Sequence, residues 1–168
     1  QRYYDTTLGM MLVYNDGTGT GTPTAGWNPV TGIHAEQVTY TEQAAGTYTG
    51  SVTVPAGASI LDIIIDGIAL WAAGTSATLK VGDGTDDDGY YTAVNLKATD
   101  LLAGESLSFS HAGGKAGAYI ANSQVSPRYS ATARTISGIV TQVGTGTTGR
   151  TRMTVIYTLP RVKAATFA

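Results

Sequence analysis

Cysteine is absent from the 168 residues of this chain, so neither disulfides nor thiolate metal sites contribute to its stability. Long hydrophobic runs are absent too, since none approaches the roughly 18 apolar residues of a membrane-spanning helix. Residues 1–7 lack the basic and apolar plan of a signal peptide. We therefore expect a soluble protein with no membrane partner and no visible export signal, stabilised by packing or by assembly.

Residues that carry catalysis are equally scarce. The two histidines, His34 and His111, stand in glycine-rich surroundings, and the sequence has no nucleophile elbow, phosphate-binding loop, zinc-protease motif or dinucleotide fingerprint. Asp62 and Asp66 share one face of a predicted strand, but two carboxylates on one strand usually form its solvent face. We expect neither an enzyme nor a bound cofactor.

Glycine and threonine, in contrast, are abundant, with 22 glycines and only 13% charged residues. This composition is typical of a β-rich, loop-rich protein. A hydrophobic fraction of 42% is enough for a real core, and the length suits a single domain.

The stretch from Thr47 to Ser110 alternates strand signals with turn signals. Apolar residues recur at every second position in four segments, the pattern of half-buried strands: 47–54, 60–66, 76–81 and 106–110. The predicted interior side chains are Leu61, Ile63, Ile65, Leu79, Val81, Leu107 and Phe109. Amphipathic strands spaced by turns predict an antiparallel sandwich or barrel.

Weaker patterns fill the rest of the chain. Tyr90 and Tyr91 are expected on opposite faces of a strand, and residues 99–104 as one helical turn. A short strand is expected at 118–121. Residues 129–143 predict a strand with Gly138 as a bulge, and 152–159 predict the last strand before Pro160.

Residues 1–46 do not have the pattern of a compact unit, whereas residues 47–168 do. The first segment predicts either an extended arm that contacts another subunit or an edge strand on its own sandwich. The apolar anchors of such an arm are Tyr3, Tyr4, Met10, Met11, Leu12, Val13, Tyr14 and Trp27.

Charge is divided unevenly along the chain. Residues 1–110 contain twelve acids and three cations, a net −9, whereas residues 111–168 contain no acid and carry +7. These cations are Lys115, Arg128, Arg134, Arg150, Arg152, Arg161 and Lys163. They predict a cationic face that docks on an acidic partner, or else strands that interleave so that the charges cancel locally. Their dispersal among small residues argues against sequence-specific nucleic-acid binding.

An acidic loop, VGDGTDDDG, separates two strand signals. Asp83, Asp86, Asp87 and Asp88 place four carboxylates close together, and Ca²⁺ prefers several oxygen ligands. The spacing is not that of an EF-hand. The loop is therefore interpreted as a solvated turn, with a cation site at Asp83, Asp86 and Asp88 as the alternative.

The sequence VPAGASILDIIIDGIALWAAGTSATLKVGDGTDDDGYYTAVNLKATDLLAGESLSF resembles structural proteins of the virion-morphogenesis modules of tailed bacteriophages, over roughly residues 50–110. A VPAGA turn, an aliphatic strand, a VGD loop ending in DGYY and an LKATDLL-like segment carry the resemblance. It implies a jelly-roll-like β-sandwich that serves as a capsid decoration (cement) or minor head protein. The implied partners are the major capsid protein and further copies of the chain, a trimer being favoured, on the capsid surface of the virion.

Two alternatives stay open. Exposed rings can stack on sugars, so a carbohydrate-binding sandwich is one, with Trp27 as the exposed tryptophan and Trp71 in the core. A phage tail or head-to-tail adaptor component is the other, since its composition would not differ.

Overall fold

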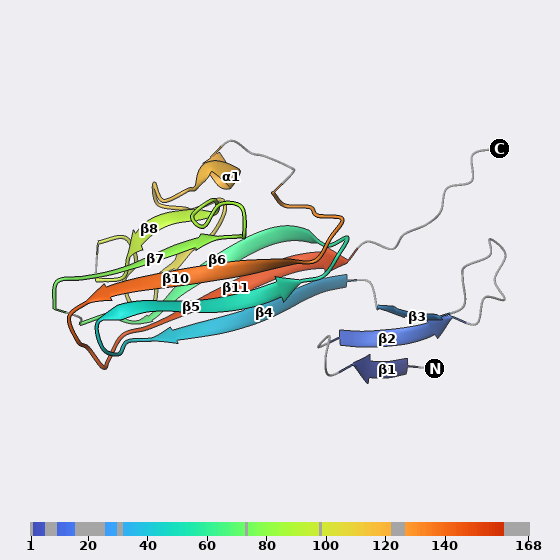
Figure 1. The fold of residues 1–168 in the computed structure, drawn as a ribbon, viewed down its shortest axis with the longest axis horizontal. Helices are drawn as coiled ribbons and strands as arrows, with labels where there is room; N and C mark the ends of the chain where they lie inside the picture. The colour runs from blue at the N-terminus through green and yellow to red at the C-terminus, as the bar shows by residue number, and fades with distance from the viewer. Residues whose placement is uncertain are drawn as a thin grey trace.

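Two four-stranded antiparallel sheets pack face to face (Figure 1). The structure is a computed structural model, which describes residues 2–5, 10–15, 26–29, 32–72, 74–97, 99–121 and 127–159, with side chains from residue 32 onward. These residues form eleven strands and one short helix. No helix within these ranges is long and apolar enough to cross a membrane. The predicted all-β antiparallel sandwich is confirmed.

Each sheet combines strands from distant parts of the chain. The first has the order β5 (Gly46–Val54), β10 (Arg134–Val143), β7 (Ser76–Gly82) and β8 (Tyr91–Asn95). The second has the order β4 (Gly32–Thr41), β11 (Arg150–Leu159), β6 (Ser59–Ala69) and β9 (Ser106–Leu107). Because β10 and β11 lie in the middle of different sheets, the connection 144–149 links the two sheets at one end of the sandwich.

The inward faces of the strands form one hydrophobic core. Its fully buried members come from both sheets, and they include Val54, Ile60, Ile63, Ile65, Leu79, Val81, Ile136, Met153 and Tyr157. Burying each such side chain contributes about 1.5–3 kcal/mol of hydrophobic free energy. Trp71 is 2% exposed, as the sequence predicts for a core residue, and its indole Nε1 donates a 2.9 Å hydrogen bond to Thr151 Oγ1.

A bulge in β6 makes one core prediction wrong. Leu61 is 44% exposed, while its neighbour Ile60 is buried. The register of β6 against β11 shifts between Ile156 and Tyr157, so Leu61 has no partner there. An extra residue in one strand moves the following side chains to the opposite face. The alternating pattern therefore predicts the buried side chains of β6 correctly from Ile63 onward and incorrectly before it.

The tyrosine pair also departs from alternation, because both Tyr90 and Tyr91 are fully buried. Tyr91 begins β8 and points inward, where its hydroxyl donates to Ile63 O at 2.7 Å. Tyr90 precedes the strand and is covered by Tyr119, whose ring meets it edge-on at 5.2 Å, and by Phe109, which stacks on it at 5.9 Å. A loop packed over the outer side of the strand buries the residue that alternation places in solvent.

Three local predictions are wrong, and a fourth, the strand 106–110, is too long. Residues 99–104 form turns without a helix, and residues 118–121 form the short helix α1 (Ala118–Ala121) where a strand was expected. Gly138 pairs regularly with Gly50 and Val81 on its two sides, so it is not a bulge. The predicted strand 106–110 shortens to β9, because the chain turns back at Ser108 to bond His111.

Gly32–Thr41 of the N-terminal segment is an edge strand of the sandwich, namely β4, paired along its length with β11. Upstream, β1 (Arg2–Asp5), β2 (Met10–Asn15) and β3 (Gly26–Pro29) form a separate three-stranded sheet, beyond one end of the sandwich in Figure 1. The edge-strand alternative therefore describes residues 32–41, and the arm role remains a prediction for residues 1–31.

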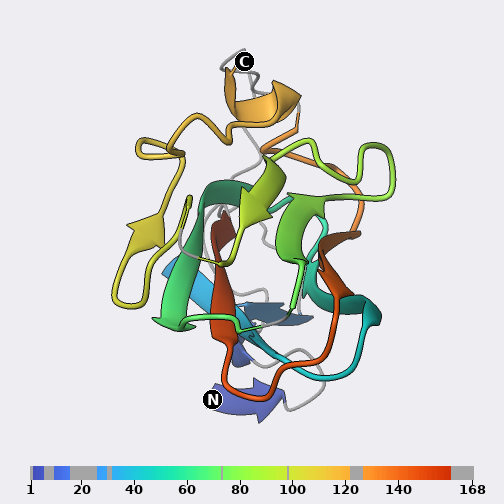
Figure 2. The same cartoon turned by 90° about the vertical axis from the view of Figure 1, so that its left-hand side faces the viewer.

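The two flanks of the sandwich differ. On the β8 and β9 flank, the segment between β8 and β10 folds back: Tyr91 bridges Ala116, and Thr92 N donates to Lys115 O at 3.0 Å. Figure 2, turned by 90° from Figure 1, shows the yellow part of this segment, which includes β9, along this flank of the sandwich. The opposite flank consists of β4 and β5, which are edge strands of different sheets. We call this β4 and β5 side the open flank. Its two edge strands are longer than β8 and β9.

Candidate contact surfaces

Two of the predicted cationic residues hold a loop in place. The guanidinium of Arg134 donates to the carbonyls of Pro127 and Arg128, the latter from Nη2 at 2.6 Å. The guanidinium of Arg128 lies over the Phe109 ring, 4.9 Å from its centroid, a cation–π contact. Both arginines thus have structural partners within the chain.

The other two described arginines of the predicted cationic face lie elsewhere. Arg150 and Arg152 begin β11, and the connection 144–149 places that end of β11 beside the end of β10 that is remote from Arg134. Arg150 is exposed. Arg134 therefore lies at one end of the sandwich and Arg150 and Arg152 at the other, and a shared cationic face remains a prediction. Arg161 and Lys163 lie outside the described residues.

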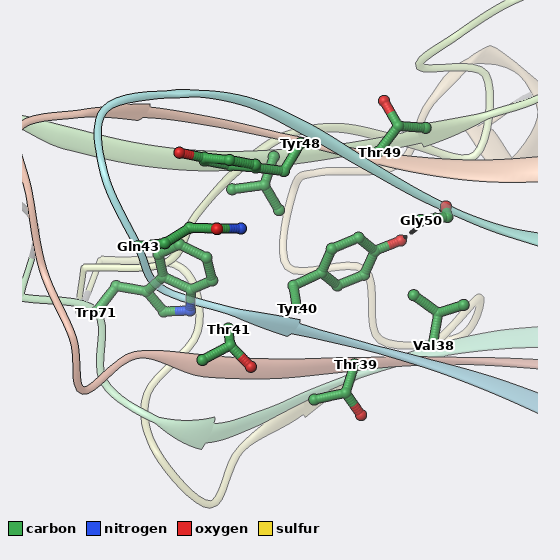
Figure 3. Close-up of a pocket in the computed structure, with 10 residues that line it drawn as sticks. Val38, Thr39, Tyr40, Thr41, Gln43, Tyr48, Thr49, Gly50 and Trp71 are labelled. Carbon is green, nitrogen blue, oxygen red and sulfur yellow. Dashed lines mark hydrogen bonds between the residues drawn. The ribbon is translucent and has the colours of Figure 1, made fainter.

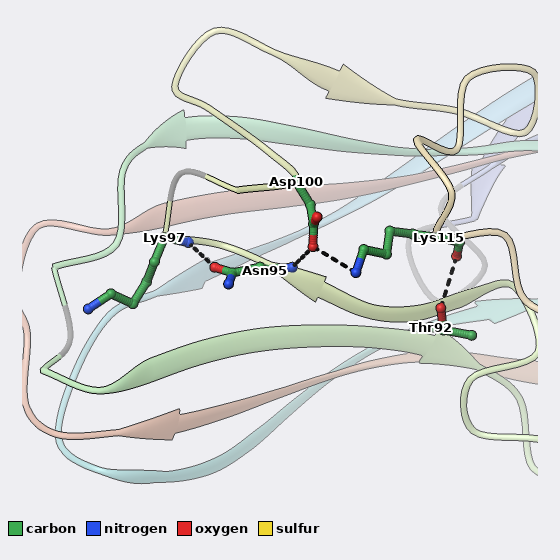
Figure 4. A network of polar contacts seen from close by, with 5 residues as sticks. All are labelled: Thr92, Asn95, Lys97, Asp100 and Lys115. Atoms are coloured by element: carbon green, nitrogen blue, oxygen red, sulfur yellow. Dashed lines mark hydrogen bonds and ion pairs between the residues drawn. The ribbon is translucent and has the colours of Figure 1, made fainter.

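Ion pairs within the fold neutralise part of the uneven charge distribution along the sequence. Arg152 binds Asp66 Oδ2 through Nε at 3.0 Å and Nη2 at 2.8 Å. Lys115 pairs with Asp100 at 3.0 Å, and the same Asp100 oxygen accepts the backbone N–H of Asn95 at 2.6 Å (Figure 4). In both pairs a cation from the basic part of the sequence meets an acid from the acidic part.

The acidic loop divides into two parts. Asp83 Oδ1 accepts hydrogen bonds from Thr85 N at 2.9 Å, Asp86 N at 3.2 Å and the Tyr119 hydroxyl at 3.3 Å, so this carboxylate organises the turn. Asp86, Asp87 and Asp88 instead bring their carboxylates within 4.8 Å of one another. Lys80 forms an ion pair with Asp87.

Two observations concern the predicted cation site at Asp83, Asp86 and Asp88. A hydrogen bond with Asp86, and then desolvation and neighbouring carboxylates, raise the pKa of Asp88. Asp83 is not part of the carboxylate group, whose third member is Asp87. Cation binding at Asp83, Asp86 and Asp88 remains a prediction, while the carboxylates that the structure brings together are those of Asp86, Asp87 and Asp88.

The open flank is a feature that the sequence did not reveal. A hollow of about 140 Å³ lies between β4 and β5. Its lining includes Val38, Tyr40, Tyr48 and Trp71, which Figure 3 labels. The Tyr40 hydroxyl donates to Gly50 O at 3.1 Å and so joins the two edge strands. The alternation at Val38 and Tyr40 predicts a strand, but nothing in the sequence predicts that this strand lies beside Gly50.

Large hydrophobic side chains are exposed outside the core. Ile33, on the edge strand β4, is 71% exposed, the highest value among them. The others are each between 42% and 48% exposed: Leu61, Ile68, Leu70, Leu102, Tyr129 and Val143. Scattered residues of this kind are common on monomers, and they are also available to a partner.

The predicted arm residues are placed by their backbone alone. Tyr3 and Tyr4 lie in β1, Met10, Met11 and Tyr14 in β2, and Trp27 in β3. Tyr4 is opposite Met11 in the β1–β2 ladder, and Tyr14 is opposite Trp27 in the β2–β3 ladder. Their side chains lie outside the described part of the structure, so their role as anchors remains a prediction.

These observations define an all-β sandwich with one covered and one open flank. No protein-family model matches the sequence, and no curated protein matches it either. Among solved structures, a chain of the acidic stable capsid of Helicobacter pylori bacteriophage KHP30 shares the fold, with a TM-score of 0.54 and 14% identity. The match covers 79% of this chain and 92% of that chain.

A chain of the capsid asymmetric unit of cyanophage Pam1 is also similar, with a TM-score of 0.50 and 17% identity over 88% of this chain and 98% of that chain. The chain therefore has a fold that is found in phage capsids. At such low identity the likeness concerns the fold, and function has to be argued from the surfaces.

Proposed function

We propose that the protein is a non-enzymatic structural component of a bacteriophage virion, which binds and stabilises the capsid shell as a decoration (cement) or minor capsid protein. The observation that supports this most is the likeness to capsid chains over 79% and 88% of this chain and over 92% and 98% of the neighbours. The sequence resemblance of residues 50–110 supports it separately.

The proposed partners are the major capsid protein and other copies of the chain, as a homo-oligomer, with a trimer favoured. A decoration protein acts mechanically, because contacts that bridge neighbouring shell subunits raise the free energy needed to separate them. Each contact needs only modest free energy, since simultaneous attachment at several points multiplies affinity through effective concentration.

The open flank supports self-association. The outward residues of β5 are uncharged (Thr47, Thr49, Ser51 and Thr53), and β5 contains no proline. Edge strands that are long, uncharged and free of proline readily add a further strand, because their outer N–H and C=O groups have no partner in the sheet. The opposite flank is covered by its own chain.

The N-terminal segment (residues 1–31) supports attachment to the shell. We place the deletion boundary before Gly32, because β4 pairs with β11 along ten residues and its removal would expose the centre of the second sheet. A variant lacking residues 1–31 therefore keeps the whole sandwich and tests the segment alone.

Sedimentation velocity tests the proposal with the full chain and with capsids of the presumed phage that lack this protein. We expect co-sedimentation that saturates at a fixed copy number, and its loss in the variant lacking residues 1–31. The variant Thr49→Lys, which places a charge on the β5 edge, should weaken self-association in the absence of capsids. Absence of co-sedimentation in every condition would contradict a shell-binding role.

A further inference from the structure

A recess of about 520 Å³ opens at the end of the sandwich where β7 ends and β10 begins. Its walls come from three separate segments, namely the acidic loop, α1 and the loop that leads into β10. The residues that carry its chemistry are Asp83, Thr85, Tyr119, Tyr129, Thr132 and Arg134. Its volume lies in the range of small-molecule sites, roughly 300–1,000 Å³.

Aromatic rings on two sides give the recess flat apolar surfaces. Tyr129 is 48% exposed, although its backbone is fixed by a bridge to Ser59. Tyr119 is partly buried and held edge-on against the Tyr90 ring. Aromatic rings present a large contact area at a low cost in conformational entropy, and they stack well on the C–H faces of a ring-shaped ligand.

The polar groups of the recess are also fixed before any ligand arrives. All three hydrogen bonds that Asp83 accepts fall on Oδ1, so within the described residues its Oδ2 carries none. Arg134 is held by two backbone carbonyls. Thr85 and Thr132 add hydroxyl groups to the wall. A carboxylate oxygen beside an aromatic ring, with hydroxyls nearby, matches a ligand that carries several hydroxyl groups on a ring.

Charge narrows the class of ligand. Asp83 lines the recess, Asp86, Asp87 and Asp88 follow it in the same loop, and Lys80 and Arg134 offset only part of their charge. The negative field disfavours anionic ligands such as uronic or sialic acids. Burial, and then Asp83, raise the pKa of Tyr119, so its phenol stays protonated and polar at neutral pH.

We propose that this recess binds a neutral saccharide, with Tyr129 stacked on one face of a pyranose ring and Asp83 Oδ2 accepting hydrogen bonds from ring hydroxyls. The site is distinct from the shell-binding surfaces proposed above and does not depend on them. A virion protein with such a site would bring the particle to glycan-bearing surfaces.

Isothermal titration calorimetry of the full chain, without capsids, tests this site. The probes are the methyl glycosides of glucose, galactose, mannose and N-acetylglucosamine, with glucuronic acid and N-acetylneuraminic acid as anionic comparators. We expect saturable binding of at least one neutral glycoside at concentrations up to about 10 mM. Tyr129→Ala should weaken that binding about tenfold or more through loss of the stacked ring.

Two further variants complete the experiment. Asp83→Asn keeps an acceptor for the turn and replaces one oxygen with an amide donor, so it should weaken binding while the melting temperature is retained. Tyr48→Ala is the matched control, because Tyr48 lies in β5 toward the opposite end of the sandwich. No binding of any neutral glycoside, a preference for the anionic sugars, or equal binding by all three variants would each overturn the proposal. Failure here leaves co-sedimentation with capsids unaffected, so the two proposals fail separately.

Discussion

Tyr40 of β4 and Gly138 of β10 face each other across the core of the sandwich. A Cβ atom at position 138 would lie 2.1 Å from the Tyr40 hydroxyl oxygen and 2.8 Å from Cζ of the ring. The hydroxyl is held there by Gly50 O at 3.1 Å and contacts Met153 Sδ at 3.9 Å. The absence of a side chain at position 138 therefore makes room for the residue that joins the two edges of the open flank.

Replacing that glycine should cost stability through steric overlap. We expect Gly138→Ala to lower the free energy of unfolding by about 1–3 kcal/mol, the usual cost of overpacking a core. Urea denaturation measures it. Tyr40→Phe removes the overlapping oxygen, so the double variant should lose less than the sum of the single variants. Gly32→Ala, at a position with nothing within 4 Å, is the control; an equal loss there would contradict the steric explanation.

Glu42 is a buried carboxylate, 4% exposed, that organises the connection between β10 and β11. Its Oε2 accepts the backbone N–H groups of Gly149 at 2.8 Å and Thr148 at 3.1 Å. Glu42→Ala should lower the free energy of unfolding by about 2–3 kcal/mol, because buried donors lose a charged acceptor. Glu105→Ala removes an exposed carboxylate that accepts Leu102 N, and should cost about 0.5 kcal/mol or less. Similar losses in chemical denaturation would refute the role of burial.

Arg134 is expected to act on the loop before β10 rather than as a free charge. Arg134→Lys keeps the charge but loses the planar fork that bridges the Pro127 and Arg128 carbonyls. Hydrogen exchange measured by mass spectrometry should become faster in residues 127–133 and stay unchanged in β11. Arg150→Ala, which removes an exposed arginine at the other end, should leave exchange in residues 127–133 as it was. Unchanged exchange in Arg134→Lys would show that charge alone suffices.

Alkaline pH should destabilise the fold through its buried tyrosines. Burial raises the pKa of Tyr40, Tyr90 and Tyr91 above the ordinary value of 10.0. Since the folded pKa lies above the unfolded one, the stabilisation is fully present below about pH 10 and is lost as pH rises further. Each such tyrosine contributes a slope of about 1.4 kcal/mol per pH unit.

Urea denaturation across that pH range, with tyrosinate absorbance as a second signal, measures this loss. Tyr91→Phe should have a shallower pH dependence than the unsubstituted chain, because one of the buried phenols is gone. Equal slopes for the two proteins would mean that Tyr91 ionises as readily in the folded state as in the unfolded one.

Several strands could be predicted from local alternation. In β7 and β11, successive side chains point to opposite faces of a regular strand, so Leu79, Val81, Met153 and Tyr157 are buried as the pattern requires. The prediction for Leu61 fails because a bulge adds a residue, and bulges depend on the partner strand. The prediction that Tyr90 and Tyr91 lie on opposite faces fails because Tyr119 and Phe109, from a later segment, cover Tyr90.

The candidate contact surfaces could be predicted less well from the sequence than the strands. Counting charges predicts an acidic and a basic part of the chain, but pairing decides where the charges meet. Arg152 reaches Asp66 because β11 lies beside β6, and Lys115 reaches Asp100 because the loop after β9 folds back. The recess between Asp83, Tyr119 and Tyr129 combines residues that are far apart in the sequence.

The sequence by itself determined the all-β class, the inward faces of its regular strands and the acidic turn, because each depends on residues a few positions apart. The tertiary structure decided which strands are edges, which arginines are used internally, and where a recess forms. Those features arise from contacts between distant segments, such as Tyr40 with Gly138 and Glu42 with Gly149, whose geometry follows from strand order and register. Local pattern carries no information about that order.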